Sequence, residues 1–295
     1  MRYFVAVAEE GSLTNAAERR LHTAQPSLSR QIRDLELEVG VSLLTRGARG
    51  IELTAAGRAF LDHARLALLQ VEIAREAAQR AARPETASFV LGFLTGHELV
   101  WLPEALRILR DEQPDVEITL SSQSSPDLAA ALVRGKIDVA FLRRETPALG
   151  LAYKFLIKEP IVAVLPAGHR LAAHKTIRPQ DLAGEIYITP TKVAPALKAV
   201  IDRYTASVGI ALKPTYDAEN LSMAMSLVAS TGGVTLLPLY VENQLSPSVV
   251  TRPLQGEVPT IDLVVGYNKA NTSPMLKRFL ARIGELVART KQRAR

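Results

Sequence analysis

The stretch from Ala55 to Arg83 constrains the fold most, because it contains no proline and only one glycine, Gly57. Alanine, leucine, arginine, glutamate and glutamine dominate it, and these residues favour helix. Thr54 is a suitable N-cap, and Pro84 ends the stretch. At 1.5 Å per residue such a helix is roughly 40 Å long, more than one compact domain needs. The sequence therefore predicts two folded parts separated by a long helix.

One face of this predicted helix is apolar and rich in small residues. That seam consists of Phe60, Ala64, Ala67, Val71, Ala74 and Ala78. A single copy of the chain offers the seam no obvious partner. We therefore expect the helix of a second subunit to pack on it, which makes the protein at least a dimer.

Length and composition exclude several classes of protein. The 295 residues allow about two domains, and 47% hydrophobic and 22% charged residues are typical of a globular protein. No apolar run approaches the ~20 residues of a membrane span, and the N-terminus does not resemble a secretory signal. The absence of cysteine excludes disulfides, thiol nucleophiles and cysteine metal sites. We expect a cytoplasmic protein that does not contact membranes.

The net charge of +6 does not by itself indicate DNA binding. Residues 277–295 contain seven basic residues and one glutamate, so the excess lies in the C-terminal tail. A second feature is more informative: every basic residue before Lys136 is arginine. Arginine is the side chain that makes forked contacts with phosphate and guanine.

Residues 1–54 predict three short helices and a hairpin. The first helix ends at Gly11, and either Ser12 or Thr14 can cap the second. Thr23 can cap the third, which ends at Gly40. The turn 22–24 between the second and third helices has the length of a helix-turn-helix turn.

The third helix has an apolar face at the spacing i, i+4, i+7 and i+11, formed by Leu28, Ile32, Leu35 and Val39. Burial of this face turns the polar start of the helix outwards, where it can enter a major groove. The DNA-contacting residues expected there are Gln25, Pro26, Ser27, Ser29, Arg30 and Arg33. A small three-helix domain with a polar face explains the same pattern and remains an alternative.

A wing is predicted after the third helix. Two short apolar runs, 41–44 and 51–53, flank a glycine-punctuated turn that carries Arg46 and Arg49. Arginines at a hairpin tip can contact the DNA backbone or minor groove, although solvated turn arginines are the alternative. Beside the helix-turn-helix, the first interpretation is favoured.

Strands and helices alternate after Pro84, which predicts an α/β domain with a parallel sheet. Strands are expected at 89–94, 116–121, 137–142, 161–165, 185–188, 214–216, 234–237 and 261–267, and helices at 102–112, 126–134, 194–208, 222–230 and 273–288. Two lobes follow, joined by crossovers near 157–161 and 255–260. The fold class is α+β multidomain: a winged helix-turn-helix at 1–58, a linker helix at 59–84 and a sensor at 85–295. Lobe I comprises 85–160 and 260–295, and lobe II comprises 161–259.

Ligands in such sheets bind beyond the carboxyl ends of the strands. In lobe I these ends offer Thr95, Gly96, Ser124, Ser125 and Arg143. Lobe II can add Thr189, Pro190 and Thr191 after its strand, and Asn220 before its helix. Hydroxyl groups, free N–H groups at a helix start and one guanidinium suit a small carboxylate. The serines can equally be helix caps.

The sequence resembles the LysR-type transcriptional regulators over nearly its whole length. The resemblance lies in residues 2–8, 16–18, 24–32 and 53–57, and the run Ala-Gln-Pro-Ser-Leu-Ser-Arg-Gln-Ile is the most specific. It is closest to the branch that senses aromatic acids, including the phenylpropionate-type regulators. The resemblance implies a periplasmic-binding-protein-like sensor, pairing through the long helix and often a homotetramer. It also places Thr95, Gly96, Ser124 and Arg143 at the effector site, with glycine where many aromatic-acid sensors have serine.

Other classes of function are disfavoured. The pair His97–Glu98 is the only acid–base pair in a candidate cleft, and we expect it to be a cap or solvent-exposed. No catalytic site, metal site or cofactor is expected. A solute-binding protein for uptake is the second hypothesis, and residues 1–84 argue against it. An α/β enzyme is the third, and it lacks a nucleophile–base pair. We therefore expect a regulator that binds double-stranded promoter DNA and a small organic acid.

Overall fold

The structure is a computed structural model that describes residues 1–47, 50–81, 88–145, 150–189 and 193–293. The chain forms two compact units, residues 1–82 and 83–295. Each unit has a hydrophobic core of its own, and the second unit has two. Within the described part of the chain, no helix has the length and apolarity to cross a membrane.

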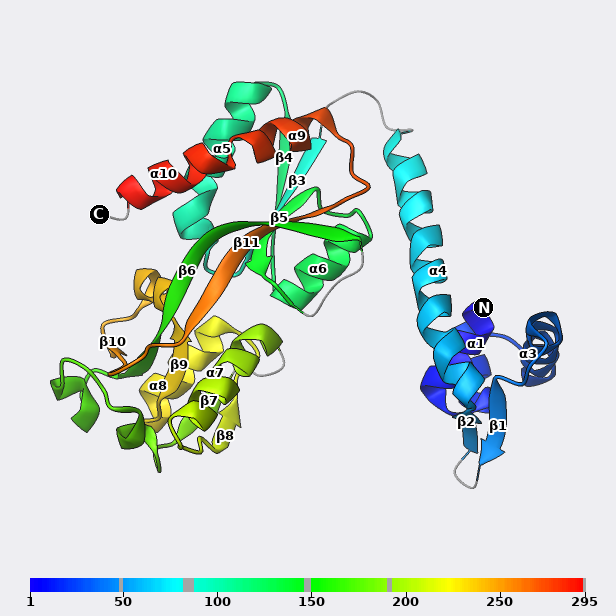
Figure 1. Cartoon of the computed structure of the whole chain (residues 1–295), viewed down its shortest axis with the longest axis horizontal. Helices are drawn as coiled ribbons and strands as arrows, with labels where there is room; N and C mark the ends of the chain where they lie inside the picture. Colours follow the sequence, from blue (N-terminus) through cyan, green and yellow to red (C-terminus); the bar gives the residue numbers. More distant parts are fainter. Residues whose placement is uncertain (48–49, 82–87, 146–149, 190–192, 294–295) are drawn as a thin grey trace. The chain divides into compact units, whose positions relative to one another are not determined.

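The first unit is a helical domain with a hairpin (Figure 1). Its elements are α1 (Arg2–Glu10), α2 (Leu13–Asn15), the π-helical turn η1 (Ala16–Leu21), α3 (Gln25–Val39), β1 (Leu44–Gly47), β2 (Gly50–Leu53) and α4 (Ala55–Ala81). The two strands pair antiparallel, with Leu44 opposite Leu53. This is a winged helix-turn-helix, followed by the long helix that the sequence predicts.

Two of the predicted caps are confirmed and one is wrong. The Ser12 hydroxyl accepts the N–H of Asn15 at 3.3 Å, and the Thr54 hydroxyl accepts the N–H of Gly57 at 2.9 Å. Thr23 does not cap α3, because the helix begins at Gln25 after an extended Ala24 and has no side-chain cap. A proline in the first turn reduces the need for such a cap, since proline has no N–H to satisfy.

The end of α3 also differs from the prediction. Leu28 and Ile32 are buried, but Val39 is 38% exposed because the last turn of α3 extends past the core. The first wing strand begins at Leu44, later than expected. A carboxylate oxygen of Glu36 accepts the N–H groups of Leu43 and Leu44 at 2.7 and 3.0 Å, which holds the connection in a turn.

Part of the apolar seam on α4 has a partner within the chain. Phe60 packs edge-on against Phe4 of α1, with ring centroids 5.3 Å apart, and Ala64 is buried in the same core. Further along the helix, Val71 is 64% exposed. The expectation that the whole seam lacks an intrachain partner is therefore wrong for its first two turns and remains a prediction at Val71.

The second unit contains a seven-stranded sheet in the order β10-β6-β11-β5-β3-β4, with β9 also paired to β6. Strands β3 (Ser88–Leu94), β4 (Glu117–Gln123) and β5 (Val139–Arg143) are parallel, since helices α5 (Glu98–Glu112) and α6 (Ser125–Val133) connect them. Strands β11 (Thr260–Asn268) and β6 (Leu151–Pro166) join them antiparallel. The expected all-parallel sheet is thus only half right.

The second lobe is built around the far end of β6 (Figure 1). Strands β9 (Thr235–Pro238) and β10 (Val249–Pro253) pair with it, and β7 (Tyr187–Thr189) and β8 (Pro214–Asp217) form a separate parallel pair. The helices are α7 (Pro195–Ser207), α8 (Leu221–Thr231) and the 3₁₀ turns η2 (Arg170–Ala173), η3 (Pro179–Leu182) and η4 (Leu239–Gln244). Helices α9 (Pro274–Ala281) and α10 (Ile283–Arg293) return to the first lobe.

Three details were not foreseen from the sequence. Near the expected crossover at 157–161 the chain passes between the lobes within a single strand, because β6 runs without a break and carries Leu156 in one hydrophobic core and Ile161 in the other. The helix predicted at 273–288 is two helices that meet at Arg282. The edge strand β10 was not predicted at all, because its sequence, Val-Val-Thr-Arg-Pro, lacks the alternation of a half-buried strand.

Candidate functional site

The start of α3 presents the polar side chains that the sequence assigns to DNA. Gln25, Pro26, Ser27, Arg30 and Arg33 are exposed, and Ser29 is half-buried. The side chain of Arg30 is 80% exposed, 3.9 Å from Asp34. A helix start with exposed glutamine, serine and arginine side chains can reach base edges and phosphates in a major groove.

The turn before α3 fixes how the helix leaves the domain. His22 has φ 49°, the left-handed conformation that an L-residue rarely adopts, and it ends the π-helical turn η1. The N–H of Thr23 then donates to the carbonyl of Ala17 at 3.0 Å. Leu28 and Ile32 anchor α3 in the core shared with α1. The recognition face is therefore held on a packed scaffold.

The wing is only partly described. Arg46 lies on β1, but its side chain is not described, and Arg49 lies outside the described residues. The hairpin is attached to the domain by its backbone, because the N–H of Ile51 donates to the carbonyl of Gly11 at 2.9 Å. Gly50 has φ 128°, and a Cβ there would lie 2.6 Å from the Gly11 carbonyl oxygen. The contacts of both arginines with DNA remain a prediction.

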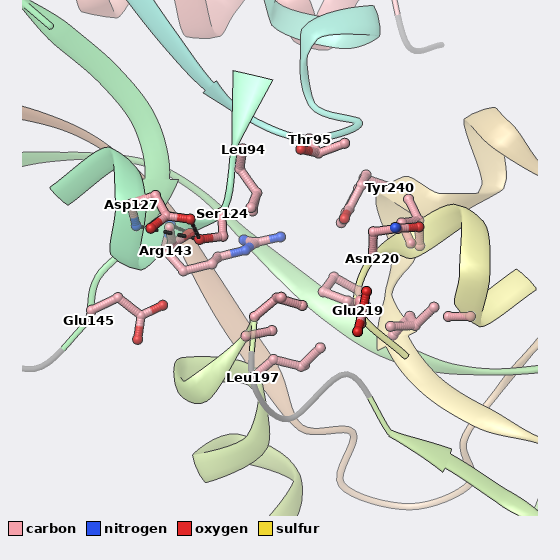
Figure 2. Close-up of a pocket in the computed structure, with 17 residues that line it drawn as sticks. Leu94, Thr95, Ser124, Asp127, Arg143, Glu145, Leu197, Glu219, Asn220 and Tyr240 are labelled. Atoms are coloured by element: carbon pink, nitrogen blue, oxygen red, sulfur yellow. Dashed lines mark hydrogen bonds between the residues drawn. The ribbon is translucent and has the colours of Figure 1, made fainter. Parts of the chain in front are cut away.

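A cavity of about 300 Å³ lies between the two lobes of the second unit (Figure 2). Thr95, Ser124 and Arg143, at the ends of three lobe I strands, line one side of it. Lobe II supplies apolar side chains, among them Leu197 and Leu237, and the ring of Tyr240. The strand ends thus meet at one site, as the sequence predicts.

Arg143 is the central group of this pocket, although it is only 4% exposed. Its guanidinium forms an ion pair with Glu159, lies 3.1 Å from Nε2 of His97 and donates to the carbonyl of Ile261 at 3.5 Å. Its Nε–H group makes no hydrogen bond to the described part of the chain. The guanidinium is therefore held in place and keeps a donor for a ligand.

The partners of Arg143 form a buried cluster. Glu159 on β6 is 8% exposed and His97 is fully buried, with 3.3 Å between its Nε2 and the Glu159 carboxylate. Burial alone raises the pKa of Glu159, but the His97 hydrogen bond and the Arg143 charge bring it below its ordinary value. Burial lowers the pKa of His97. The cluster is thus a carboxylate with one guanidinium and a neutral imidazole.

The two predicted serines have local partners. The Ser124 hydroxyl donates to the Asp127 carboxylate at 2.6 Å, and the N–H of Asp127 donates back to Ser124 at 3.4 Å. Ser125 is buried, and its hydroxyl accepts the backbone N–H of Arg143 at 2.9 Å. Both act in the structure as capping or bracing residues, which was the alternative interpretation of these positions.

The remaining predicted effector residues fall in three different places. Thr95 lines the pocket and accepts a hydrogen bond from Ser122 at 3.2 Å. Gly96 is not among the residues that line the pocket, and its carbonyl accepts a hydrogen bond from Nε2 of Gln244 at 2.9 Å. Thr189 lines a separate cavity under α7, and Pro190 and Thr191 lie outside the described residues. Asn220, also expected on the lobe II side, does line the pocket, and its side chain accepts the N–H of Met223 at 2.8 Å.

Sequence reasoning missed the groups that surround Arg143. Tyr240 comes from η4, far along the chain, and no local signal connects it with the strand ends. Glu159 did carry a signal, because it is a charged residue close to a long apolar run in β6. Of the two expectations for the pair His97–Glu98, capping is borne out, since His97 is the N-cap residue of α5 and the Glu98 carboxylate accepts the N–H of Gly96 at 2.7 Å. Exposure is wrong for His97, whose side chain is buried between Glu159, Arg143 and Tyr240.

Carboxylates also line the pocket. Glu145 follows β5, and burial raises the pKa of its carboxyl, while a hydrogen bond from the backbone of Ala196 lowers it. Glu219 lies just before the start of α8, and Asp127 lies in the first turn of α6. These carboxylates disfavour a bound anion, and Arg143 is the one cationic side chain among the described lining residues that can offset them.

The fold and the site define a two-domain regulator, in which a winged helix-turn-helix accompanies a two-lobed ligand-binding domain. Residues 1–58 match the bacterial regulatory helix-turn-helix proteins of the lysR family, and residues 82–288 match the LysR substrate binding domain. The chain belongs to the LysR family. It is a DNA-binding transcriptional regulator with an effector-binding domain, and it is not an enzyme.

Similar proteins align over almost the whole chain. The Hca operon transcriptional activator HcaR of Escherichia coli K12 is 39% identical, covering 98% of this chain and 97% of that protein. AlsR of Bacillus subtilis is 36% identical, covering 95% and 93%. The crystal structure of full-length BenM has a TM-score of 0.58 at 26% identity, covering 98% and 95%. Full-length CbnR complexed with its target DNA has a TM-score of 0.57 at 26% identity, covering 97% of both chains.

Proposed function

We propose that the effector is a small aromatic carboxylic acid, bound between the lobes with its carboxylate beside Arg143. We further propose that the protein acts in the cytoplasm, and that it binds promoter DNA as a homodimer or homotetramer joined through α4. The effector then changes how the paired DNA-binding domains engage the promoter.

The observation that carries the effector proposal is a braced guanidinium, the one cationic side chain among the described residues that line the pocket. Glu159 holds the guanidinium of Arg143 in one orientation, so that its Nε–H can bind an oxyanion with little loss of side-chain freedom. Leu94, Leu197 and Leu237 suit the apolar body of the ligand.

The position of the pocket between the two lobes supports a regulatory role for it. The lining comes from both lobes, so a ligand that contacts both favours the closed arrangement by the difference in its affinity for the two states. A reciprocal coupling between effector and promoter affinity follows from linkage. The exposed start of α3 and the exposed part of the α4 seam support the DNA and oligomer parts of the proposal.

Titration calorimetry of the full chain tests the effector proposal. Benzoate and 3-phenylpropionate are compared with their neutral amides, which keep the shape and lose the charge. We expect the acids to bind and the amides to bind at least tenfold more weakly, because a hydrogen bond to a charged group is stronger than one to a neutral group.

The variant Arg143→Ala tests whether the acid binds beside Arg143. It should abolish acid binding while promoter affinity without ligand stays within a few-fold, since the two functions reside in separate units. Equal affinity for acid and amide contradicts the carboxylate. Unchanged acid binding by the variant contradicts the site.

A further inference from the structure

Position 96 has no room for a side chain. Gly96 has φ +96°, a conformation that L-residues rarely adopt. A Cβ there would lie 2.4 Å from Nε2 of Gln244 and 2.9 Å from Cε2 of Tyr240. Both neighbours belong to η4 of the opposite lobe. The lobe I turn at this strand end is therefore covered directly by a lobe II segment.

Several contacts fix the ring of Tyr240 against that turn. Its centroid lies 3.7 Å from the ring centroid of His97, which is fully buried. The guanidinium carbon of Arg143 lies 5.8 Å from the Tyr240 centroid. Gln244, one helical turn further along η4, donates to the Gly96 carbonyl at 2.9 Å. The ring thus has one defined position relative to the guanidinium.

The hydroxyl of Tyr240 is available to a ligand. Figure 2 shows the side chain pointing into the pocket from the side opposite Leu94, towards the guanidinium of Arg143. In the part of the chain that the structure describes, this hydroxyl has no hydrogen-bond partner. Burial raises the pKa of Tyr240 to about 12, so that the phenol keeps its proton near neutral pH.

We propose that Tyr240 determines effector specificity: its hydroxyl donates a hydrogen bond to the same carboxylate that Arg143 binds. This rests on the proposed function, in which the effector is an acid. The two donors come from different lobes, Arg143 from lobe I and Tyr240 from lobe II. One carboxylate group therefore links the lobes and makes its own binding dependent on their closure.

The arrangement selects a particular chemical class. A carboxylate has two oxygens that only accept, so it can receive the Arg143 Nε–H and the Tyr240 hydroxyl together. The amide of the same acid has one accepting oxygen, and its NH₂ group places donors against the donors of the site. Tyr240 thus adds discrimination against neutral analogues beyond what the charge of Arg143 supplies.

The test is titration calorimetry of full-length Tyr240→Phe against benzoate, 3-phenylpropionate and their amides. The ring stays and only the hydroxyl is lost, so the melting temperature without ligand should remain close to that of the wild type. We expect acid affinity to fall roughly tenfold to a hundredfold, the range for a hydrogen bond to a charged group. Amide affinity should hardly change, which brings the acid-to-amide ratio towards one.

Tyr216→Phe is the matched control, because Tyr216 is a lobe II tyrosine that is 42% exposed and lies outside the pocket lining. It should bind as the wild type does. If Tyr240→Phe binds the acids as tightly as the wild type, the role of Tyr240 is refuted and the acid effector stands. If neither acid binds the wild type, the proposed function fails, and the role of Tyr240 fails with it.

Discussion

The ion pair between Arg143 and Glu159 gives the largest predicted effect on stability. Both side chains are at least nine-tenths buried, with exposures of 5% and 10%. Replacing Glu159 by glutamine keeps the shape and removes the negative charge. Arg143 then remains as a buried cation with no counter-ion in the described part of the cluster, beside a His97 that is itself neutral.

The size of the effect follows from the burial. Removing one partner of a buried ion pair costs about 3–5 kcal/mol, whereas an exposed pair contributes about 0–1 kcal/mol. For a domain of about 200 residues each kcal/mol lowers the melting temperature by about 2–4 °C. Glu159→Gln should therefore lower the melting temperature of the second unit by roughly 6–20 °C. Asp202→Asn, which breaks the exposed pair with Lys198, should lower it by less than about 4 °C.

The single tryptophan makes the assay specific to the right unit. Trp101 is 2% exposed in the core of lobe I, and the first unit contains no tryptophan. Thermal unfolding followed by tryptophan fluorescence therefore reports the second unit alone. A loss no greater than that of Asp202→Asn would refute the reasoning, because it would mean that water or another group already compensates Arg143.

The same variant has a pH signature and a ligand signature. The pKa of Glu159 lies below its ordinary value of 4.5, so its ionised form stabilises the fold above that pH. The stability gap between wild type and variant should persist at neutral pH and shrink as the pH falls below 4.5, where the wild-type carboxylate becomes protonated.

A bound acid would become the counter-ion of Arg143, so benzoate should stabilise Glu159→Gln more than it stabilises the wild type.

Three further predictions concern other parts of the chain. Arg30→Ala should weaken specific DNA binding by about 1–3 kcal/mol in salt-controlled shift assays; an equal loss on random duplexes would make Arg30 a phosphate contact instead. Ala67→Glu with Val71→Glu places like charges on the seam, where Ala67 is half-buried and Val71 exposed, and should separate subunits in sedimentation; an unchanged oligomer would locate the association surface elsewhere. Glu285, whose pKa the hydrogen bonds from Arg282 and then Arg107 lower to about 2, stabilises the fold above pH 4.5, and this contribution is lost as the pH falls towards 2. Glu285→Gln should therefore melt below the wild type at pH 7 and level with it near pH 2, and a gap that persists there would contradict this.

Local patterns were enough to predict most of the architecture. The Pro-free stretch, the Ser12 and Thr54 caps and the alternation after Pro84 each depend on neighbouring residues, and each led to the right element. The carboxyl ends of parallel strands lie at one edge of a sheet, so Thr95 and Arg143 could be brought together from the strand order alone.

Long-range partners could not be predicted in this way. The antiparallel strand β11 joins residues that are more than a hundred positions from those of β5, and periodicity carries no information about strand direction. Likewise, the Ser124 hydroxyl could have bound a ligand or capped a helix. In the structure it donates to the nearby Asp127 carboxylate, as a capping residue does. The site is the part of the molecule where lobe II side chains such as Tyr240 meet lobe I, which only the folded chain reveals.

The continuity of β6 has a consequence for how this domain can be altered. The strand pairs with β11 over residues 151–160 and with β9 and β10 over residues 161–166. One inserted or deleted residue near Pro160 would reverse the facing of every later side chain in the strand, since facing alternates residue by residue. Exchange of lobe II between relatives therefore requires matching strand register at this point of β6.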